Sequence, residues 1–438
     1  MRDRPITVVG TGTGAPLPPD AAAAVAGAGL VVGGRRHLAA APVTADAEQV
    51  VLGALAPALD TIERYLDDER QPDGEEHPDG EPHEPRPDRP GPVVVLASGD
   101  PGFFGIVRVL AERFGAERLD VRAGVSSVAA AFARLGLPWD DAVVVSAHGR
   151  ELRTAVNVCR ARPKVAVLTG PGAGPAELGA ALGSAARVLV VASALGSEEE
   201  RVERVTPAEA AARDWGSSVN VVLCLDEARA LGAVRTVAGP PAGPAGWALA
   251  EEDFAHRDSM ITKFEVRALA LARLGPRLGD LVWDIGAGSG SVAVECARFG
   301  AAVTAVEKTG DGAGRIRANA AAHGVDVRVV HGAAPTVLSG LDDPDAVFVG
   351  GGGRELPAVV TACARRARRT VVVAMAALDR VPAARAALTD AGFDCDGVLL
   401  QSSRLAPLPG DVTRLAATNP VFLLWGVRPP ARPEGANQ

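Results

Sequence analysis

Aromatic side chains are scarce in this sequence. They make up 4% of its 438 residues, with a single tyrosine, and the formal net charge at pH 7 is −8. A protein that binds nucleic acid needs a basic face and aromatic rings on which bases can stack. The composition therefore argues against nucleic acid as a partner, although it leaves local basic pockets open.

Cysteine is scarce as well. The five cysteines lie far apart, at Cys159, Cys224, Cys296, Cys363 and Cys395, and none forms a CxxC pair. An odd number at such spacings indicates neither a disulfide framework nor a zinc site. We therefore expect a cytoplasmic protein without a bound metal ion.

Long apolar runs are missing too. No run reaches the roughly 18 to 20 residues that a membrane-crossing helix needs. The apolar segment 21–34 consists mostly of alanine and glycine, and it follows a strand-like run instead of the basic leader of a signal peptide. We expect a soluble chain without a signal peptide or membrane contact, long enough for about three folding units of roughly 150 residues.

The most informative stretch runs from Leu281 to Glu307. LVWDIGAGSG is followed by the helix-like SVAVECARFG and by a second apolar run that ends in an acid, a pattern typical of strand, loop, helix and strand. Gly286, Gly288 and Gly290 let the loop turn tightly and present backbone N–H groups at the positive end of a helix. Glu307 lies about 20 residues beyond the first glycine, where a carboxylate can bind both hydroxyls of a ribose. The predicted ligand is a nucleoside.

The GxGxG spacing, with Asp284 just before it, resembles the S-adenosylmethionine loop of class I methyltransferases, and the longer GxGxxG of dinucleotide folds is absent. The resemblance implies donor contacts at Gly286, Ala287, Gly288, Ser289, Gly290 and Glu307. A nicotinamide enzyme and a glycine turn without a ligand remain the alternatives, because short motifs produce false matches.

An α/β unit also opens the chain. From Ile6 the sequence reads ITVVG, then TGTGAP, then an alanine-rich helical segment to about Gly29, then the strand-like LVVGGRR. Many turns between a strand and a helix carry glycine for steric reasons alone. By themselves, Gly10, Gly12 and Gly14 therefore do not distinguish a ligand site from a structural turn.

The stretch from Gln71 to Pro92 differs from the rest of the chain. It contains seven prolines, many acids and almost nothing to bury. Such a composition cannot offset the entropy of ordering, so we predict a disordered surface loop over about 70–92. His77 and His83 could bind a metal there, but a solvated polar tract is the favoured interpretation.

The next stretches, GDPGFFGI, GVSSVAAAFARLGLPW and SAHGR, resemble the tetrapyrrole methylases, in particular the branch that methylates precorrin-6Y at carbon 5. In that family the donor lies in a cleft between two α/β halves. The resemblance implies donor contacts at Gly12, Thr13, Gly99, Asp100, Pro101, Phe104, Ser126, Ser127 and Thr169. At Thr13 the chain departs from related methylases, which often carry proline there.

From Trp247 onward the resemblance shifts to the methyltransferases that act at carbon 15 and decarboxylate. DSMITKFEVRALALARLG precedes the glycine loop at the expected place and implies a donor contact at Thr262; PDAVFVGGGG, 344–353, is the predicted fourth strand with its loop. Ala333 replaces the aspartate usual after the third strand, which leaves the backbone of Ala334 to contact adenine. Ala374 replaces a usual asparagine on the acceptor side.

Together these resemblances predict an α/β fold with two parts. A two-lobed tetrapyrrole methylase fold over 1–237, with lobes at about 1–118 and 119–237, precedes a linker at 238–247, a class I (Rossmann-like) S-adenosylmethionine-dependent methyltransferase fold over 248–430 and a tail at 431–438. Three strand-like runs are expected in the second lobe, in KVAVLTGPGAGPAEL, RVLVVASALGSEEERV and SSVNVVLCLDE.

The chain as a whole resembles the fused precorrin-6Y C5,15-methyltransferases (decarboxylating) of cobalamin biosynthesis. The family implies two donor molecules, methylation of meso carbons 5 and 15 of the tetrapyrrole, and loss of carbon dioxide from the ring C acetate to give precorrin-8. It also implies self-association, with a tetramer built on the C-terminal units as one form. We find no catalytic triad, so the catalytic side chains stay unknown. Alignment and exclusion of water can supply much of the acceleration.

The substrate carries many carboxylates, so basic side chains should line each cleft. Arg404 and Arg414, which we expect in a loop before the last strand, are the candidates, with exposed surface arginines as the alternative. Two other functions stay open: methylation of a different small acceptor, and a binding or scaffold role with one or both donor sites lost.

Overall fold

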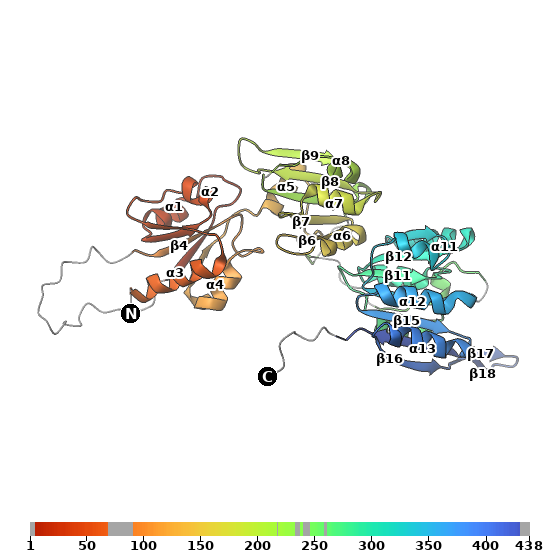
Figure 1. The fold of residues 1–438 in the computed structure, drawn as a ribbon. Coiled ribbons are helices and arrows are strands. Elements are labelled where there is room, and N and C mark those ends of the chain that lie inside the picture. The colour runs from red at the N-terminus through yellow and green to blue at the C-terminus, as the bar shows by residue number, and fades with distance from the viewer. Residues whose placement is uncertain are drawn as a thin grey trace, which may run out of the picture.

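A computed structural model of the chain describes residues 5–68, 91–216, 218–232, 237–239, 246–257 and 261–429. The predicted loop with His77 and His83 falls almost wholly outside these ranges, as do most of the predicted linker and the tail. In the described part, strands form three sheets of five, five and seven strands and one separate hairpin, which follow one another along the chain (Figure 1). Each helix among the described residues is too short or too polar to span a bilayer.

The first sheet is parallel throughout, in the order β3-β2-β4-β1-β5. Its strands are β1 (Ile6–Gly10), β2 (Leu30–Gly33), β3 (Glu48–Val51), β4 (Val93–Ala97) and β5 (Leu119–Arg122). Its helices are α1 (Pro19–Ala26), α2 (Arg35–Ala40), α3 (Leu55–Asp68) and α4 (Val107–Phe114). Apolar clusters cover both faces of the sheet, which explains the nearly continuous apolar strands.

The second sheet is mixed, in the order β6-β7-β10-β8-β9, with only β6 and β7 parallel. Its strands are β6 (Val143–Ser146), β7 (Lys164–Leu168), β8 (Val188–Ser193), β9 (Arg201–Val205) and β10 (Asn220–Leu225), and its helices are α5 (Ser127–Leu135), α6 (Leu152–Ala161), α7 (Pro175–Leu182) and α8 (Pro207–Ala211). The run RVLVVASALGSEEERV, expected as one strand, forms the antiparallel pair β8 and β9. The turn at Gly196, which has a φ of 81°, lies between them.

The third sheet has the order β13-β12-β11-β14-β15-β19-β16, in which β19 runs antiparallel to both of its neighbours. Its strands are β11 (Leu281–Ile285), β12 (Ala302–Glu307), β13 (Arg328–His331), β14 (Ala346–Val349), β15 (Thr370–Met375), β16 (Asp394–Leu400) and β19 (Val421–Val427). Its helices are α9 (Phe264–Leu274), α10 (Ser291–Arg298), α11 (Gly310–Ala322), α12 (Leu356–Arg366) and α13 (Val381–Asp390). The strand order reverses between β11 and β14, which is where α/β sheets of this kind open a crevice for ligands.

Two further strands, β17 (Ser403–Leu408) and β18 (Val412–Ala417), form an antiparallel hairpin. The expectation of a loop around Arg404 and Arg414 is therefore wrong. The two runs are joined at Gly410 and Asp411, both with positive φ. Two short runs around a Gly-containing turn are consistent with a hairpin.

A buried ion pair fixes the segment that precedes α9. The side chains of Arg267 and Glu295 are both fully buried, with Nε and Oε1 3.6 Å apart. Arg267 donates to the carbonyl oxygens of Thr262 and Leu249, and Glu295 accepts from the Leu249 N–H. The pair therefore holds the chain around Thr262 against the core of the third sheet.

We predict that Glu295→Gln lowers the free energy of unfolding by about 3 kcal/mol, because it leaves the Arg267 charge buried without its counter-ion. Urea denaturation of the full chain measures the change. Glu252→Gln, an exposed carboxylate in the same segment, is the matched control and should change stability by less than about 0.5 kcal/mol. Equal effects of the two substitutions would contradict the role of the buried pair.

Candidate functional site

The loop after β11 depends on its glycines. Gly286, Gly288 and Gly290 have φ values of 69°, 58° and 75°, a left-handed region that favours glycine. A Cβ on Gly286 would lie 3.0 Å from the backbone of Gly351 in the loop after β14, and one on Gly290 would lie 2.9 Å from Ile316 of α11. The loop is thus closely packed on two sides.

Glu307, at the end of β12, is anchored to this loop. Its Oε2 accepts from the Gly288 N–H at 3.0 Å, and its Oε1 accepts from the N–H and hydroxyl of Thr309 at 3.0 and 2.8 Å. Burial by itself would raise the pKa of Glu307, but these hydrogen bonds outweigh it, so the pKa is lowered. The structure therefore brings an ionised carboxylate directly against the glycine loop, as the ribose-binding prediction requires.

Asp284 lies beneath the same loop, on β11. Its side chain is 1% exposed, and its Oδ2 accepts from the Ala293 N–H in the first turn of α10 at 3.0 Å. Its Oδ1 has no partner among the described residues. Burial, which outweighs that hydrogen bond, raises the pKa of Asp284 to about 7, and the charge of Glu307 adds to the effect. An unpaired buried oxygen in this position fits a site that a polar ligand completes.

The other residues predicted around this loop are placed as follows. Ser289 is buried, with its carbonyl oxygen accepting from Asn319 Nδ2 at 2.8 Å, and Ala287 donates its N–H to Val306. Ala334 lies two residues after Gly332, whose N–H donates to the carbonyl of Glu307 at 2.9 Å. The loop that contains Ala334 therefore runs beside the site. Thr262 makes no hydrogen bond to the glycine loop among the described residues.

In the first sheet, three loops meet at the carboxyl ends of β1, β4 and β5. Gly12 and Gly99 exchange backbone hydrogen bonds of 3.2 and 3.0 Å. A Cβ on Gly10 would lie 2.5 Å from the Gly124 nitrogen, and a Cβ on Gly124 would lie 2.4 Å from the Gly99 carbonyl oxygen. Only glycine permits this approach, so the meeting point, here called the glycine junction (Gly10, Gly12, Gly99 and Gly124), is built from backbone.

Several predicted donor contacts surround the glycine junction. The Cα of Ser126 would lie 3.6 Å from a Cβ on Gly99, and the Ser126 hydroxyl accepts from the Ala129 N–H at the start of α5, which begins at the neighbouring Ser127. Asp100, next to Pro101, accepts from the Gly102 N–H at 2.8 Å. The structure thus brings the loops of the first sheet together at the start of a helix of the second.

Thr13 and Thr169 lie towards the second sheet. A Cβ on Gly196, in the turn between β8 and β9, would meet the Thr13 carbonyl oxygen at 1.7 Å, so the first glycine loop contacts both sheets. The Thr169 hydroxyl lies 2.6 and 2.8 Å from the carbonyl and amide oxygens of Asn220. Among the described residues it makes no hydrogen bond to the glycine junction.

The sequence interpretation missed Arg150, which lines the same pocket as the predicted donor contact Phe104. A pocket of about 220 Å³ is lined by Phe104 from the loop after β4 and by Ser146, Arg150 and Thr154 from β6, α6 and the loop between them. Phe104 is 54% exposed and has a φ of 55°. Arg150 ends the SAHGR motif just beyond the carboxyl end of β6, and a basic residue at that end of a strand was the available signal.

The two predicted substrate arginines lie on the same face of the β17–β18 hairpin. The Arg404 guanidinium donates to both carboxylates of Glu251 and Glu265, at distances of 2.7 to 2.9 Å, and these hydrogen bonds hold the pKa of Glu251 at about 2. Arg414 is exposed. Arg404 is therefore already neutralised, whereas Arg414 faces solvent.

Comparison with known families gives two matches along the chain. Residues 5–211 match the family described as Tetrapyrrole (Corrin/Porphyrin) Methylases, and residues 252–427 match the family described as Precorrin methyltransferase domain. The first match covers the glycine junction and Arg150. The second covers the glycine loop, Asp284 and Glu307.

Three curated relatives are similar to this chain over different shares of its length. A precorrin-6Y C(5,15)-methyltransferase [decarboxylating] of Sinorhizobium sp is 37% identical over 361 residues, covering 80% of this chain and 79% of the relative. A protein of the same name from Mycobacterium tuberculosis is 37% identical over 274 residues, covering 61% and 66%. A cobalt-precorrin-7 C(5)-methyltransferase of Salmonella typhimurium is 32% identical over 227 residues, covering 51% of this chain and 99% of the relative.

The two family matches fall on the two groups of candidate residues, and the first relative aligns across both. The chain belongs to the precorrin-6Y C(5,15)-methyltransferases (decarboxylating), a family of S-adenosylmethionine-dependent C-methyltransferases.

Proposed function

We propose that this chain methylates precorrin-6Y at meso carbons 5 and 15 and removes the ring C acetate carboxyl as carbon dioxide, which gives precorrin-8. The unit at 1–237 acts at carbon 5, and the unit at 248–430 acts at carbon 15 and in decarboxylation. The observation that carries the proposal is the presence of two unlike glycine-lined loop clusters, each at the carboxyl edge of a parallel sheet.

The residues of the third sheet fit the adenosyl donor. Glu307 offers an ionised carboxylate for ribose hydroxyls, the loop at 286–290 offers close backbone, and Asp284 has an unpaired buried oxygen. When bound, S-adenosylmethionine supplies a methyl group on a positively charged sulfur that is already a strong electrophile. The protein's part is to align the meso carbon with that methyl group and to exclude water.

The glycine junction supports a second donor site of different construction. There the close backbone of Gly12 and Gly99, the hydroxyls at Ser126 and Ser127 and the carboxylate of Asp100 surround one point between two sheets. None of these groups carries a positive charge that would repel a sulfonium. We infer two donor molecules per chain, one at each cluster.

The acceptor's carboxylates require basic side chains near each cluster. Arg150 shares a pocket with Phe104 beside the first cluster, and Arg414 is exposed on the face of the hairpin that Arg404 ties to Glu251 and Glu265. We assign Arg150 and Arg414 to substrate carboxylates. To bind a carboxylate of the substrate, Arg404 must release Glu251 or Glu265. Its contribution to substrate binding therefore includes holding the hairpin in place.

One observation favours a second candidate function. Ala333 stands where an aspartate is usual in relatives, so the adenine amine at the second site has one fewer side-chain acceptor. A chain with a single working donor site, or one that accepts another small molecule, would fit that change.

Self-association, with a tetramer built on the C-terminal units, remains part of the proposal.

Donor stoichiometry distinguishes these alternatives. Calorimetric titration of the full chain with S-adenosylmethionine should give two sites. Gly124→Ala should abolish one, because the added Cβ would lie 2.4 Å from the Gly99 carbonyl oxygen, and Glu307→Gln should weaken the other about tenfold to hundredfold. Gly53→Ala, where a Cβ meets nothing within 4 Å, is the control. A single site in the unsubstituted chain would contradict the proposal.

The raised pKa of Asp284 predicts a pH dependence of stability. Between its ordinary value of 3.8 and about 7, the folded chain holds a proton that the unfolded chain has lost, so Asp284 destabilises the fold as pH rises through this window. Asp284→Asn should flatten the fall of the melting temperature between about pH 4 and 7. Asp390→Asn, at an exposed position, should not. A variant curve parallel to that of the parent would refute the assignment.

Arg150 and Arg414 should act on different steps. Arg150→Ala should raise the KM of carbon 5 methylation about tenfold to hundredfold, because the substrate loses a charged hydrogen bond. Arg414→Ala should raise the KM of carbon 15 methylation and decarboxylation by a similar factor for the same reason. Mass spectrometry of the products distinguishes the steps. Arg108→Ala, an exposed arginine on α4, should leave both unchanged. Equal slowing of both steps by Arg150→Ala would rule out the assignment of one arginine to each cleft.

A further inference from the structure

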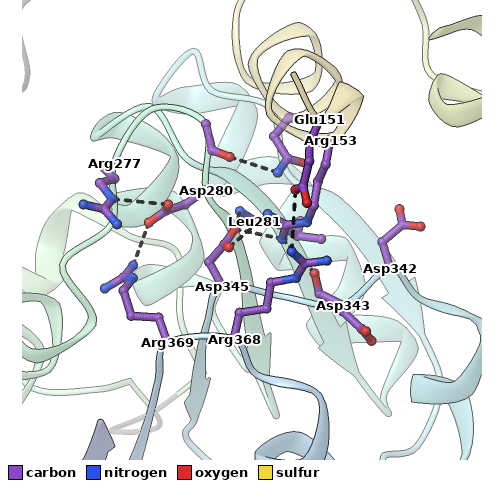
Figure 2. Close-up of polar contacts among 12 residues, drawn as sticks. Glu151, Arg153, Arg277, Asp280, Leu281, Asp342, Asp343, Asp345, Arg368 and Arg369 are labelled. Carbon is purple, nitrogen blue, oxygen red and sulfur yellow. Dashed lines mark hydrogen bonds and ion pairs between the residues drawn. The ribbon is translucent and has the colours of Figure 1, made fainter. Parts of the chain in front are cut away.

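The second and third sheets meet through polar side chains, with Arg153 on one side and Asp345 on the other (Figure 2), and Arg368 also lies on the third sheet's side. Arg153, on α6, forms a bidentate pair with Asp345 at 2.9 and 2.8 Å and also donates to the Asp343 carbonyl oxygen. About two turns further along α6, Arg160 donates to Asp342 at 2.9 Å. Both contacts join residues about 190 positions apart in the chain, and both place the cation on the second sheet's side.

A second cluster repeats this polarity. Arg187 and Arg229 both donate to Asp326 Oδ2, at 2.8 and 2.7 Å, and Arg229 also reaches the Gly324 carbonyl oxygen. The Arg187 side chain is only 6% exposed. A reversed pair, Glu151 with Arg368, is longer, at 3.9 Å, and largely exposed, so it carries little weight.

Neutral contacts also join the two units, beside a pocket of about 340 Å³ that is lined from one side by Arg153 and Arg160 and from the other by Asp342, Asp343 and Arg368. The buried Asn157 donates to the Gly279 carbonyl oxygen at 3.0 Å, and Leu278 packs against the apolar cluster beneath α6 and α7. A Cβ on Gly300 would lie 2.5 Å from an Arg162 nitrogen. The interface therefore combines an apolar anchor with a buried amide that has a partner, as specific interfaces do, whereas Arg162 Nε is buried without a hydrogen-bond partner among the described residues.

All of these acceptors lie at one edge of the third sheet. Gly279, Asp326 and Asp345 precede β11, β13 and β14 respectively, so they mark the amino edge. The helices that cover the sheet end at this edge, where their last carbonyl groups carry partial negative charge. Arg229, for example, reaches Gly324 just after α11 ends at Ala322.

We propose that the arginine face of the second sheet (Arg153, Arg160, Arg187 and Arg229) is a docking surface that recognises the amino edge of the third sheet by charge, and that it holds the two units together without the covalent link at 238–247. The partner it fits is the amino edge of a class I methyltransferase unit, where Asp326, Asp342 and Asp345 accept from these arginines. Docking at this edge leaves the carboxyl edge, with Glu307 and its glycine loop, open to donor and substrate.

The test is to cleave the folded full chain at a protease site placed within 238–247 and to measure the mass in solution by analytical ultracentrifugation. At about 50 mM salt the two pieces should sediment together. At about 1 M salt, where the Debye length falls to roughly 3 Å, their association should weaken at least tenfold. Pieces that separate at low salt, or whose association does not weaken at high salt, would overturn the proposal.

Charge variants sharpen the test. The double variant Asp326→Lys with Asp342→Lys should separate the cleaved pieces at low salt, and Arg160→Asp combined with Asp342→Arg should restore association lost in Asp342→Arg alone. Asp390→Lys, at an exposed carboxylate at the end of α13, adds the same charge as each Asp→Lys substitution at the interface. It should not change the association of the cleaved pieces. Circular dichroism of each uncut variant shows that it is folded. Association that survives the double variant would also overturn the proposal, and no readout depends on donor or substrate.

Discussion

The direction of the parallel strands in the third sheet determines where everything else can bind. The covering helices return antiparallel to the strands, so their N-termini gather at the carboxyl edge and their C-termini at the amino edge. α10 begins just beyond the glycine loop, and α11 begins just beyond Glu307 and ends beside Asp326. One edge therefore presents N–H groups to a ligand. The opposite edge presents carbonyl groups and aspartates to arginines.

The two donor clusters solve the same problem by different local means. In the third sheet, glycines with positive φ shape a loop that Glu307 clamps from the next strand. In the first sheet the loops are held by close backbone packing, in which Gly10 and Gly124 leave no room for a Cβ. The hydrogen bonds described for both clusters involve backbone, hydroxyl and carboxylate groups, which suits a cationic donor.

The features predicted correctly from the sequence are those encoded locally. The strand, glycine loop and helix from Leu281 onward follow from apolar periodicity and from residues that need a special φ, and a carboxylate at the end of β12 follows from the spacing of a βαβ unit. β14 and its glycine-rich loop were found in the same way. The site residues themselves remain predictions, because a local pattern indicates where a ligand can bind and not whether it does.

What could not be predicted depends on contacts between distant segments. The neutralisation of Arg404 involves Glu251 and Glu265, some 140 to 150 positions away, and no periodicity reports such a pairing. The hairpin at 403–417 had a weak local signal, the Gly410–Asp411 turn between two short runs, that the loop interpretation passed over. The distribution of arginine between the second and third sheets also depends on pairs that lie far apart in the sequence.

That distribution also reconciles an acidic chain with an acidic substrate. A net charge of −8 would repel a polycarboxylate at long range, but the field that a ligand meets is set within about 10 Å by the nearest groups. Arg153 and Arg187 are neutralised at the interface and Arg404 by its two glutamates, so they add little to the field at either cleft. Arg150 and Arg414, which face solvent, are the arginines that we propose as contacts for the acceptor's carboxylates.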